Sequence, residues 1–472
     1  MPEYLAPGVY VEEIERGPKP IEGVATSTAA FLGETERGPI QPRLVTSYND
    51  YLRVFGGVFA DDKFMPHAVN AFFENGGRRG YVCRITGKDA TLAFHEFDDY
   101  RVTAVGPGKW GKQVFVKITE STTKVFDSAT SAMKAIGIKV QIAYWQTEPP
   151  GGTLPDPFPG TSDPAYSGPT PTHVERFDDI VLDNPSSPNY FTKRIGDPKK
   201  PGQGNSTLIV FDLKPSAVVP AQLNVPVSSA LDQEGADGSA PITKVEYVGR
   251  NEDPSRRTGL EALLLDPFRE VALVYAPNAQ EDVVKEVVSH CENQRFRFAV
   301  IDTDAGKGNP ANIDPRSKND SKYAAFYYPW VTISDPQTGA RRKIPPGGAV
   351  LGIYARSDSE RGVFKAPANE VVRGSLDLEY SIDEKTQEVL NPRCVNVIRQ
   401  FPGRGIRVWG ARTLSSDPLW KYVSVRRLFI FLEHSIYEGT QWVVFEPNDE
   451  RLWARVIDTI RLFLRTQWRN GA

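Results

Sequence analysis

Residues 420–472 read WKYVSVRRLFIFLEHSIYEGTQWVVFEPNDERLWARVIDTIRLFLRTQWRNGA, and this stretch decides how the end of the chain folds. Apolar residues recur at helical spacing on both sides of Glu438-Gly439, which predicts two amphipathic helices separated by a turn. The apolar run Trp442–Phe445 predicts a short strand between them. Pro447-Asn448-Asp449 predicts the start of the second helix, because Asn and Asp side chains accept hydrogen bonds from the free amides of a first helical turn.

The second predicted helix, over residues 451–469, has two chemically different faces. At about 100° per residue, one broad arc is apolar and consists of Leu452, Trp453, Val456, Ile457, Ile460, Phe463, Leu464 and Trp468. The opposite arc carries Arg451, Arg455, Asp458, Arg461, Arg465 and Arg469, and only Leu462 interrupts it. We therefore expect the apolar arc to be buried and the arginines to form a cationic surface.

The overall composition is that of an ordinary globular protein. The chain has 472 residues, of which 40% are hydrophobic and 24% charged, with a formal net charge of −3. This length predicts two to four domains, and the charge favours neither nucleic acid nor membrane as a partner of the whole chain. The start MPEYLAPG lacks the features of a signal peptide, and no apolar run reaches the roughly twenty residues that span a bilayer. We expect a soluble protein that is made in the cytoplasm.

Neither a disulfide framework nor a metal site is indicated. The three cysteines, Cys83, Cys291 and Cys394, lie far apart and form no C-x-x-C pair. The five histidines show no metal-binding spacing, and each is expected to be a surface or helix residue. We therefore predict no metal and no cofactor.

Charge is unevenly distributed along the chain. Residues 393–472 contain 13 Lys and Arg against 7 Asp and Glu, whereas the first 15 residues contain four glutamates and no basic side chain. Such asymmetry favours contacts between unlike surfaces, including contacts between copies of one chain.

Residues 1–22 have the pattern of an extended arm. Pro7-Gly8 predicts a turn, Val9-Tyr10-Val11 is β-prone, and Gly17–Pro20 is a semi-rigid spacer that cannot join a central strand. So short a segment buries little by itself. It must pair either inside its own subunit or with the sheet edge of a neighbour.

The remaining chain divides into three further predicted domains. Residues 23–95 plus 251–360 form a central α/β domain, because strand–helix–strand spacing over 271–302 predicts a parallel pair and residues 24–95 are expected to complete its sheet. Residues 96–250 form an inserted β-rich domain with long loops, and residues 361–472 form a C-terminal α+β domain with amphipathic helices. The strands predicted in the insertion are Val114–Thr119, Lys139–Tyr144, Thr207–Leu213 and Lys244–Val248.

Several ordered motifs resemble contractile tail sheath proteins, which form the sheaths of phage tails, R-type pyocins and antifeeding-prophage-like injection systems. They are PGVYVEE from Pro7, AFLGETERGP from Ala30, AVNAFFENGGRRGYVCRI from Ala68, PPGGAVLGIYARSDSERGVFKAPANEVVRG from Pro345, FPGRGIRVWGARTL from Phe401 and the final stretch quoted above. The likeness covers both ends and the middle of the chain and is weak only over residues 96–250.

The resemblance implies a structural subunit that is not an enzyme. It implies stacked hexameric rings around an inner tube, and a central domain with a subtilisin-like fold but no active site. Its partners would be neighbouring copies, the tube protein, and baseplate and terminator or cap proteins, without nucleic acid or membrane insertion. An arm that contains Pro7, Gly8, Val9, Tyr10, Val11, Glu12 and Glu13 would join a neighbouring subunit, and Arg451, Arg455, Arg461, Arg465 and Arg469 would face the tube. A further C-terminal arm would follow Ala472.

Two motifs suggest other chemistry. Gly106–Gln113 fits seven positions of a P-loop, but Gln113 replaces the magnesium-binding hydroxyl and a strand rather than a helix follows, so a glycine turn is expected. Asp302-Thr-Asp304-Ala-Gly-Lys307 follows a strand where α/β sheets bind ligands, but it lacks the spacing of a calcium loop. The alternative functions are an α/β hydrolase or nucleotide binder at Asp302, and a baseplate or cap component built on the sheath domains.

Overall fold

The computed structural model describes residues 20–97, 100–128, 131–160, 164–197, 199, 204–213, 225–251, 253, 256–302 and 310–472. The chain divides into two compact units. Unit 1 contains the N-terminal residues up to Val24 together with Leu428–Ala472, and unit 2 contains Ala25–Arg427. The chain therefore passes between the units twice, after Val24 and after Arg427.

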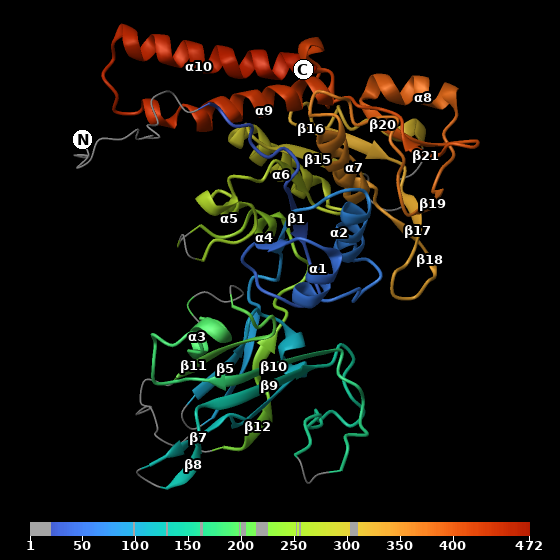
Figure 1. Cartoon of the computed structure of the whole chain (residues 1–472). Helices are drawn as coiled ribbons and strands as arrows, with labels where there is room; N and C mark the ends of the chain where they lie inside the picture. Colours follow the sequence, from blue (N-terminus) through green and yellow to red (C-terminus); the bar gives the residue numbers. More distant parts are fainter. Residues whose placement is uncertain are drawn as a thin grey trace, which may run out of the picture. The chain divides into compact units, whose positions relative to one another are not determined.

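An eight-stranded sheet forms the centre of unit 2, with the order β2-β3-β1-β14-β15-β16-β20-β21 (Figure 1). Its six inner strands are parallel, and the edge strands β2 and β21 are antiparallel to their neighbours. The strands are β1 (Ala29–Gly33), β2 (Arg43–Val45), β3 (Gly80–Arg84), β14 (Leu273–Tyr275), β15 (Phe298–Asp302), β16 (Ala324–Tyr328), β20 (Val395–Phe401) and β21 (Gly405–Val408). Because β1 pairs with β14, residues 24–95 do complete the sheet of the later strand–helix–strand segment, as predicted. The sheet also extends beyond residue 360, since β20 pairs with β16.

Helices cover this sheet, whose inner strands are buried along their whole length in β1, β3, β15 and β16. Continuous burial explains why these strands are apolar runs rather than alternating ones. The helices are α1 (Tyr48–Phe55), α2 (Met65–Glu74), α4 (Lys244–Val248), α5 (Gly259–Ala262), α6 (Glu281–Gln294), α7 (Gly347–Glu360) and α8 (Glu384–Leu390). Helices α6 and α7 both contact β14 and β15, and α2 packs against α7 and β1. Short 3-10 turns occur at η3 (Asp266–Phe268), η4 (Pro310–Asn312), η5 (Asn391–Arg393) and η6 (Pro418–Trp420).

Two glycines allow α7 to approach α2 closely. A Cβ atom on Gly348 would lie 2.3 Å from the carbonyl oxygen of Ala68, and one on Gly352 would lie 2.4 Å from that of Phe72. Both distances are shorter than any real Cβ contact, so larger residues would force the helices apart. This close crossing gives a physical reason for the sequence GGAVLG at the start of α7.

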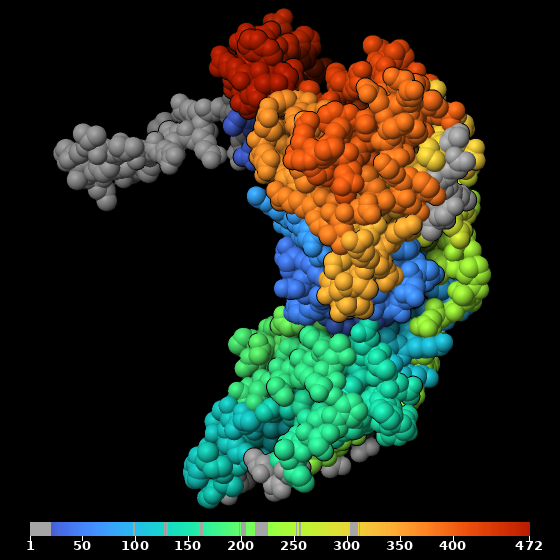
Figure 2. Space-filling model, turned by 90° about the vertical axis from the view of Figure 1, so that its right-hand side faces the viewer, coloured from blue at the N-terminus to red at the C-terminus, as the bar shows by residue number. Residues whose placement is uncertain are grey.

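A three-stranded sheet lies beside the central one, with the order β18-β17-β19. Its strands are β17 (Val331–Ser334), β18 (Arg341–Ile344) and β19 (Ser375–Leu378). Figure 2 shows the light orange residues of this region over blue residues from the N-terminal third of the chain. The contact includes Arg342, whose Nη2 donates to the carbonyl oxygens of Ala60 at 3.4 Å and Asp61 at 2.7 Å.

Residues 91–236, between β3 and α4, contain a β-sandwich. Two four-stranded antiparallel sheets, β10-β9-β6-β12 and β11-β5-β4-β13, share one apolar core that includes Val102, Trp110, Val116, Ile142 and Phe211. The strands are β4 (Thr91–Glu96), β5 (Tyr100–Ala104), β6 (Val114–Glu120), β9 (Ile138–Tyr144), β10 (His173–Ile180), β11 (Ile209–Leu213), β12 (Val227–Ala230) and β13 (Gln233–Ala236), and α3 (Phe191–Arg194) accompanies them. A separate hairpin, β7 (Lys124–Asp127) and β8 (Ala132–Ala135), extends from the sandwich (Figure 1).

One predicted strand of this region is a helix. Lys244–Val248 forms α4 because Thr243 and Glu246 make a capping box: the Thr243 side chain accepts from the Val245 amide, and Glu246 accepts from the Thr243 amide at 2.8 Å. The pattern S/T-x-x-E is visible in the sequence and should have outweighed the β-prone valines. The P-loop-like motif, in contrast, is a glycine turn as predicted, because a 3-10 turn, η1 (Lys109–Gln113), leads directly into β6.

Unit 1 is built around two helices. They are α9 (Val423–Gly439), whose first residues belong to unit 2, and α10 (Glu450–Arg469). The strand predicted at Trp442–Phe445 is wrong: Gln441–Val443 is a 3-10 turn, η7, and the Val443 amide donates to the Thr440 carbonyl. Local turn bonds satisfy this backbone, and no strand among the described residues pairs with it.

Candidate functional site

The arm residues Pro7, Gly8, Val9, Tyr10, Val11, Glu12 and Glu13 lie outside the described residues. The segment that follows them is anchored to α9. The Val24 amide donates to Ser435 Oγ at 3.1 Å. Ile21 is buried, and it packs so closely on Gly439 that a Cβ atom there would lie 2.6 Å from the Ile21 side chain. Residues 21–24 therefore bring the beginning and the end of the chain together in unit 1.

The predicted start and the cationic arc of the last helix are both present. Asp449 is the N-cap of α10, and its carboxylate accepts from the Leu452 amide at 2.8 Å. All five arginines of the arc are exposed. Arg455 lies 3.6 Å from Glu446, and Arg461 lies 3.4 Å from Asp458, with every side chain in these pairs at least 42% exposed. Because such exposed pairs are weak, the arc remains able to bind an acidic partner.

The expectation that the apolar arc of α10 is buried is wrong for the chain by itself. Only Leu452 and Phe463 of this arc are buried, and Phe463 contacts the ring of Phe431 on α9 with centroids 6.1 Å apart. The exposed members are Trp453 at 53%, Ile457 at 52%, Leu464 at 40% and Trp468 at 73%. The helix therefore packs along a narrow seam, because α9 is the only other helix among the described residues of unit 1. Exposed apolar patches of this kind mark interaction sites.

The Asp302 region has a structural explanation. The Asp302 carboxylate lies at the end of β15 and accepts hydrogen bonds from the Tyr275 hydroxyl and, at 3.3 Å, from the Gly347 amide. It thereby anchors the first turn of α7, where negative charge is favoured. Burial, and then the Asp302 charge, raise the pKa of Tyr275 well above its usual value. Asp304 and Lys307 of the same motif lie outside the described residues.

Other chemistry is not prominent in the described part of the chain. No group of three or more His, Cys, Asp or Glu side chains there could hold a metal ion. The described helices include none with the length and apolar character of a membrane span. His67 and His290 lie on helices α2 and α6, as predicted, and burial lowers their pKa values to about 4 and about 3. The prediction is wrong for His95 and His173, which are partly buried on the strands β4 and β10.

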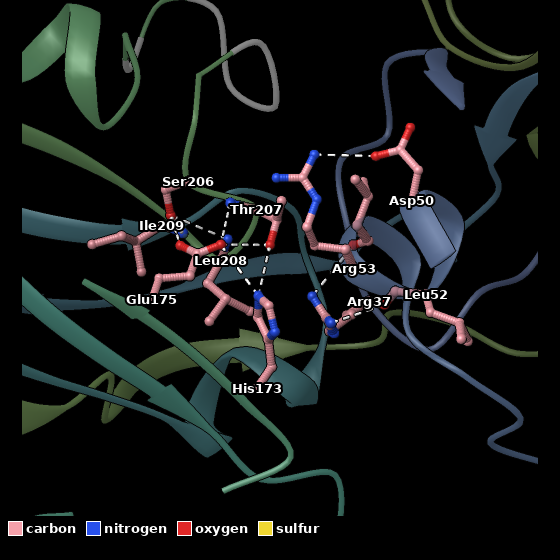
Figure 3. A network of polar contacts seen from close by, with 11 residues as sticks. Arg37, Asp50, Leu52, Arg53, His173, Glu175, Ser206, Thr207, Leu208 and Ile209 are labelled. Atoms are coloured by element: carbon pink, nitrogen blue, oxygen red, sulfur yellow. Dashed lines mark hydrogen bonds and ion pairs between the residues drawn. The ribbon is translucent and has the colours of Figure 1, made fainter. Parts of the chain in front are cut away.

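A polar network holds the β-sandwich together, and no sequence motif indicates it (Figure 3). Glu175 on β10 accepts from Ser206 Oγ at 2.6 Å, from the Thr207 amide at 2.9 Å and from Thr207 Oγ1 at 2.7 Å. These residues lead into β11, so Glu175 links the two sheets. Its pKa is lowered, because these hydrogen bonds outweigh the opposing effect of burial.

A second network joins the sandwich to the central sheet. Glu36, which follows β1, accepts from the Tyr144 hydroxyl, from the Gly57 amide at 2.7 Å and from Gln146 Nε2 at 3.2 Å. Arg37 stacks on the Tyr144 ring at 5.1 Å and donates to the Leu52 carbonyl at 3.0 Å. A cavity of about 630 Å³ lies beside this junction. The carboxylate of Glu36 is already satisfied by the protein, so the network serves to fix the junction.

The chain matches two sheath families along its second half. Residues 251–414 match the family described as phage tail sheath protein central domain, and residues 415–472 match the phage tail sheath C-terminal domain. A putative prophage major tail sheath protein of Pseudomonas aeruginosa is 28% identical over 252 residues, which are 52% of this chain and 63% of that protein. The tail sheath protein of Burkholderia phage BcepMu is 25% identical and covers 49% of this chain and 53% of its own. The chain thus spans less than two thirds of these curated relatives.

Solved structures show the same fold over almost the whole chain. The helical sheath of the anti-feeding prophage in its contracted state covers 99% of this chain and 85% of its own, with a TM-score of 0.51 at 21% identity. A sheath tail protein from Listeria innocua covers 96% of this chain and 87% of its own, with a TM-score of 0.57 at 12% identity. At these identities the likeness concerns the fold alone.

Proposed function

We propose that the chain, whose residues 251–472 match the two phage tail sheath domains, is the structural subunit of a contractile sheath. Copies polymerise as stacked hexameric rings around an inner tube and contract to drive the tube through a target envelope. The observation that carries this proposal is the unbroken match of residues 251–472 to the two sheath families. Other partners are baseplate and cap proteins, and assembly takes place in the cytoplasm.

We assign the central domain, residues 23–95 plus 251–360, a subtilisin-like fold without an active site. The parallel order of β1, β14 and β15 supports this assignment. The role of Asp302 as an anchor for α7 supports a protein that is not an enzyme. Residues 96–250 form an outer domain, and residues 361–472 form the C-terminal domain apart from β20 and β21, which belong to the central sheet.

The two ends of the chain carry the contacts between subunits in this proposal. Residues 1–22 form the arm, and Pro7–Glu13 add to the sheet of a neighbouring subunit. The anchoring of Ile21 and Val24 on α9 supports it, because an arm can hold a neighbour only if its own base is fixed. The exposed arginines at 451, 455, 461, 465 and 469 face the tube.

Such contacts account for both the filament and its contraction. A heterologous contact that does not close by rotation generates an open helical filament. Backbone hydrogen bonds of an exchanged strand contribute about 0.5–1.5 kcal/mol each, so several of them retain a neighbour while the subunit bodies rotate. The extended lattice is kinetically trapped and relaxes to a compact one by rigid-body motion, without ATP.

Negative-stain microscopy of the purified chain tests this function. We expect long striated tubes from the full chain, and folded monomers without tubes after deletion of Met1–Pro20. Deletion of the exposed residues 151–153 in a loop of the β-sandwich is the matched control, and it should leave tube length unchanged.

A baseplate component is the second candidate, because a chain of similar fold occurs in the anti-feeding prophage baseplate at 21% identity. Single rings that do not stack would favour this alternative. Normal tubes from the arm deletion would refute the role of the arm, and monomers of the full chain under all assembly conditions would refute both functions.

A further inference from the structure

A single carboxylate connects two segments that are far apart in the sequence. Asp358, near the end of α7, receives two bonds from Arg427 on α9: Nη1 donates to Oδ1 at 2.9 Å and Nη2 donates to Oδ2 at 2.6 Å. Thr26 Oγ1 donates to the same Oδ2 at 2.6 Å. Arg427 Nη2 also donates to the Thr26 carbonyl at 2.9 Å, which closes the triangle.

This cluster is shielded from solvent. The side chains of Arg427 and Asp358 are only 4% and 6% exposed. The guanidinium lies 4.6 Å above the ring of Tyr354, whose hydroxyl is 2.7 Å from that of Tyr327 on β16. Burial alone would lower the pKa of Arg427, but the charge and hydrogen bonds of Asp358 outweigh it and raise that pKa. Arg427 therefore keeps its positive charge although it is buried.

The position of the cluster is its most informative property. Unit 2 begins at Ala25 and ends at Arg427. Thr26 and Arg427 are thus the places where the chain enters and leaves this unit, and no other covalent connection to unit 1 exists. Asp358 fixes both places at once, although it lies 332 residues from Thr26 and 69 from Arg427.

Stability alone does not account for such a pair. Apolar residues of similar volume often replace a buried ion pair without loss of stability, whereas removal of one partner costs several kcal/mol. A bidentate guanidinium–carboxylate pair provides directional geometry that apolar packing lacks. The hydroxyl of Thr26 extends this fixed geometry to the second segment.

We propose that Asp358 is a positioning residue that clamps the two segments where the chain passes between the units, at Thr26 and at Arg427. Because one carboxylate holds both segments, they open together rather than one after the other. On the proposed sheath function, tension on the chain's own arm and on α10 reaches unit 2 through these two crossings. Because the clamp distributes tension over both segments, one segment does not detach while the other stays in place. The clamp itself is a property of the single chain and does not depend on the sheath.

Hydrogen exchange followed by mass spectrometry tests this clamp in the monomeric full-length protein. In D358N we expect amides of β1 and of the first turns of α9 to exchange at least about tenfold faster, and both segments to change together. D266N is the matched control, because Asp266 makes an exposed ion pair with Arg269 at 3.5 Å. It should change neither segment.

Two further variants separate positioning from packing. In T26V one bond is lost and the ion pair remains, so we expect a smaller acceleration that still affects both segments. In D358L/R427M apolar packing replaces the ion pair. We expect the melting temperature to return to the wild-type value, whereas the amides of both segments should still exchange fast. Three results would each overturn the clamp. They are wild-type amide exchange rates in D358N, exchange of the two segments at independent rates, and full protection of both segments in D358L/R427M. Tube formation by the wild-type chain is a separate readout, so the clamp and the sheath function can fail independently.

Discussion

Charge reversal on α10 tests whether its arginines bind the tube. The variant is R455E/R461E/R465E, and the three side chains are exposed, so the protein should still fold. Within the chain the variant converts the pairs of Arg455 with Glu446 at 3.6 Å and Arg461 with Asp458 at 3.4 Å into like-charge contacts. It also removes the guanidinium that lies 5.2 Å from the centroid of the Trp442 ring. Exposed pairs and exposed cation–π contacts contribute up to about 1 kcal/mol each, and the new repulsions are of similar size, so the unfolding free energy should fall by less than about 5 kcal/mol.

The effect on binding should be larger than the effect on folding. Two unit charges about 4 Å apart in water attract with about 1 kcal/mol, and reversal converts this attraction into a repulsion of the same size. Each substitution therefore changes the contact by about 2 kcal/mol, and three change it by about 6 kcal/mol for every subunit. Salt screens such contacts, with a Debye length of about 8 Å at physiological ionic strength.

Co-sedimentation with preassembled inner tube measures this contact. We expect the variant to remain in the supernatant at about 0.1 M salt, and loading of the wild-type sheath to decline as salt rises towards about 1 M. K88E/K134E/K385E introduces the same charge change at exposed lysines elsewhere and should load normally. Equal loading of both variants, together with salt-independent loading of the wild type, would show that the arginines do not contact the tube.

Three other expected outcomes concern folding. G352A should lower the unfolding free energy by about 1–3 kcal/mol in urea denaturation, because the new Cβ meets a carbonyl oxygen of α2 at 2.4 Å. S359A, on the exposed side of the same helix, should leave the unfolding free energy nearly unchanged. D449A should cost about 1 kcal/mol and speed hydrogen exchange in the first turn of α10, and D449N should retain most of the cap. The His290 ring accepts from Arg297 at 2.6 Å and its pKa is lowered from 6.5 to about 3. The unfolded chain therefore binds a proton that the folded chain does not, and stability is lost as pH falls through this window. In denaturation experiments at pH 4–6, H290Q should reduce the dependence of the unfolding free energy on pH by about 1.4 kcal/mol per pH unit.

Local chemistry in the sequence predicted much of this fold. Asp449 caps α10 where expected, since a short acceptor before a helical pattern acts on its own next turn. The strand–helix–strand segment over 271–302 predicted β14 and β15, which are buried along their whole length. The capping box of Thr243 and Glu246 is equally local, but the β-prone residues Lys244–Val248 predicted a strand in its place.

Long-range contacts could not be predicted in this way. Helical periodicity shows that α10 has an apolar arc, but not that its own unit leaves Trp453 and Trp468 exposed. Strand β10 escaped prediction because half of its residues are charged, and most hydrogen bonds to Glu175 come from residues 31 and 32 positions later. The Asp358 cluster has no sequence signal at all, because its members meet only after the sheet and both helices have formed.

Function as one subunit of a polymer explains both the exposed apolar arc of α10 and the buried clamp at Asp358. A monomer gains nothing from leaving large apolar side chains in water, since each exposed ring forfeits the free energy that its burial would provide. It also gains little from a buried ion pair that apolar packing could replace. A subunit that neighbours pull on needs both features: a surface that is completed only by a partner, and a joint that holds the connections to that surface at a fixed geometry. The surface and the joint lie on either side of the same boundary, after Arg427, and α9 runs through it without interruption. On the proposed sheath function, tension on α10 passes along the chain to α9, whose first turns belong to unit 2 and contain Arg427.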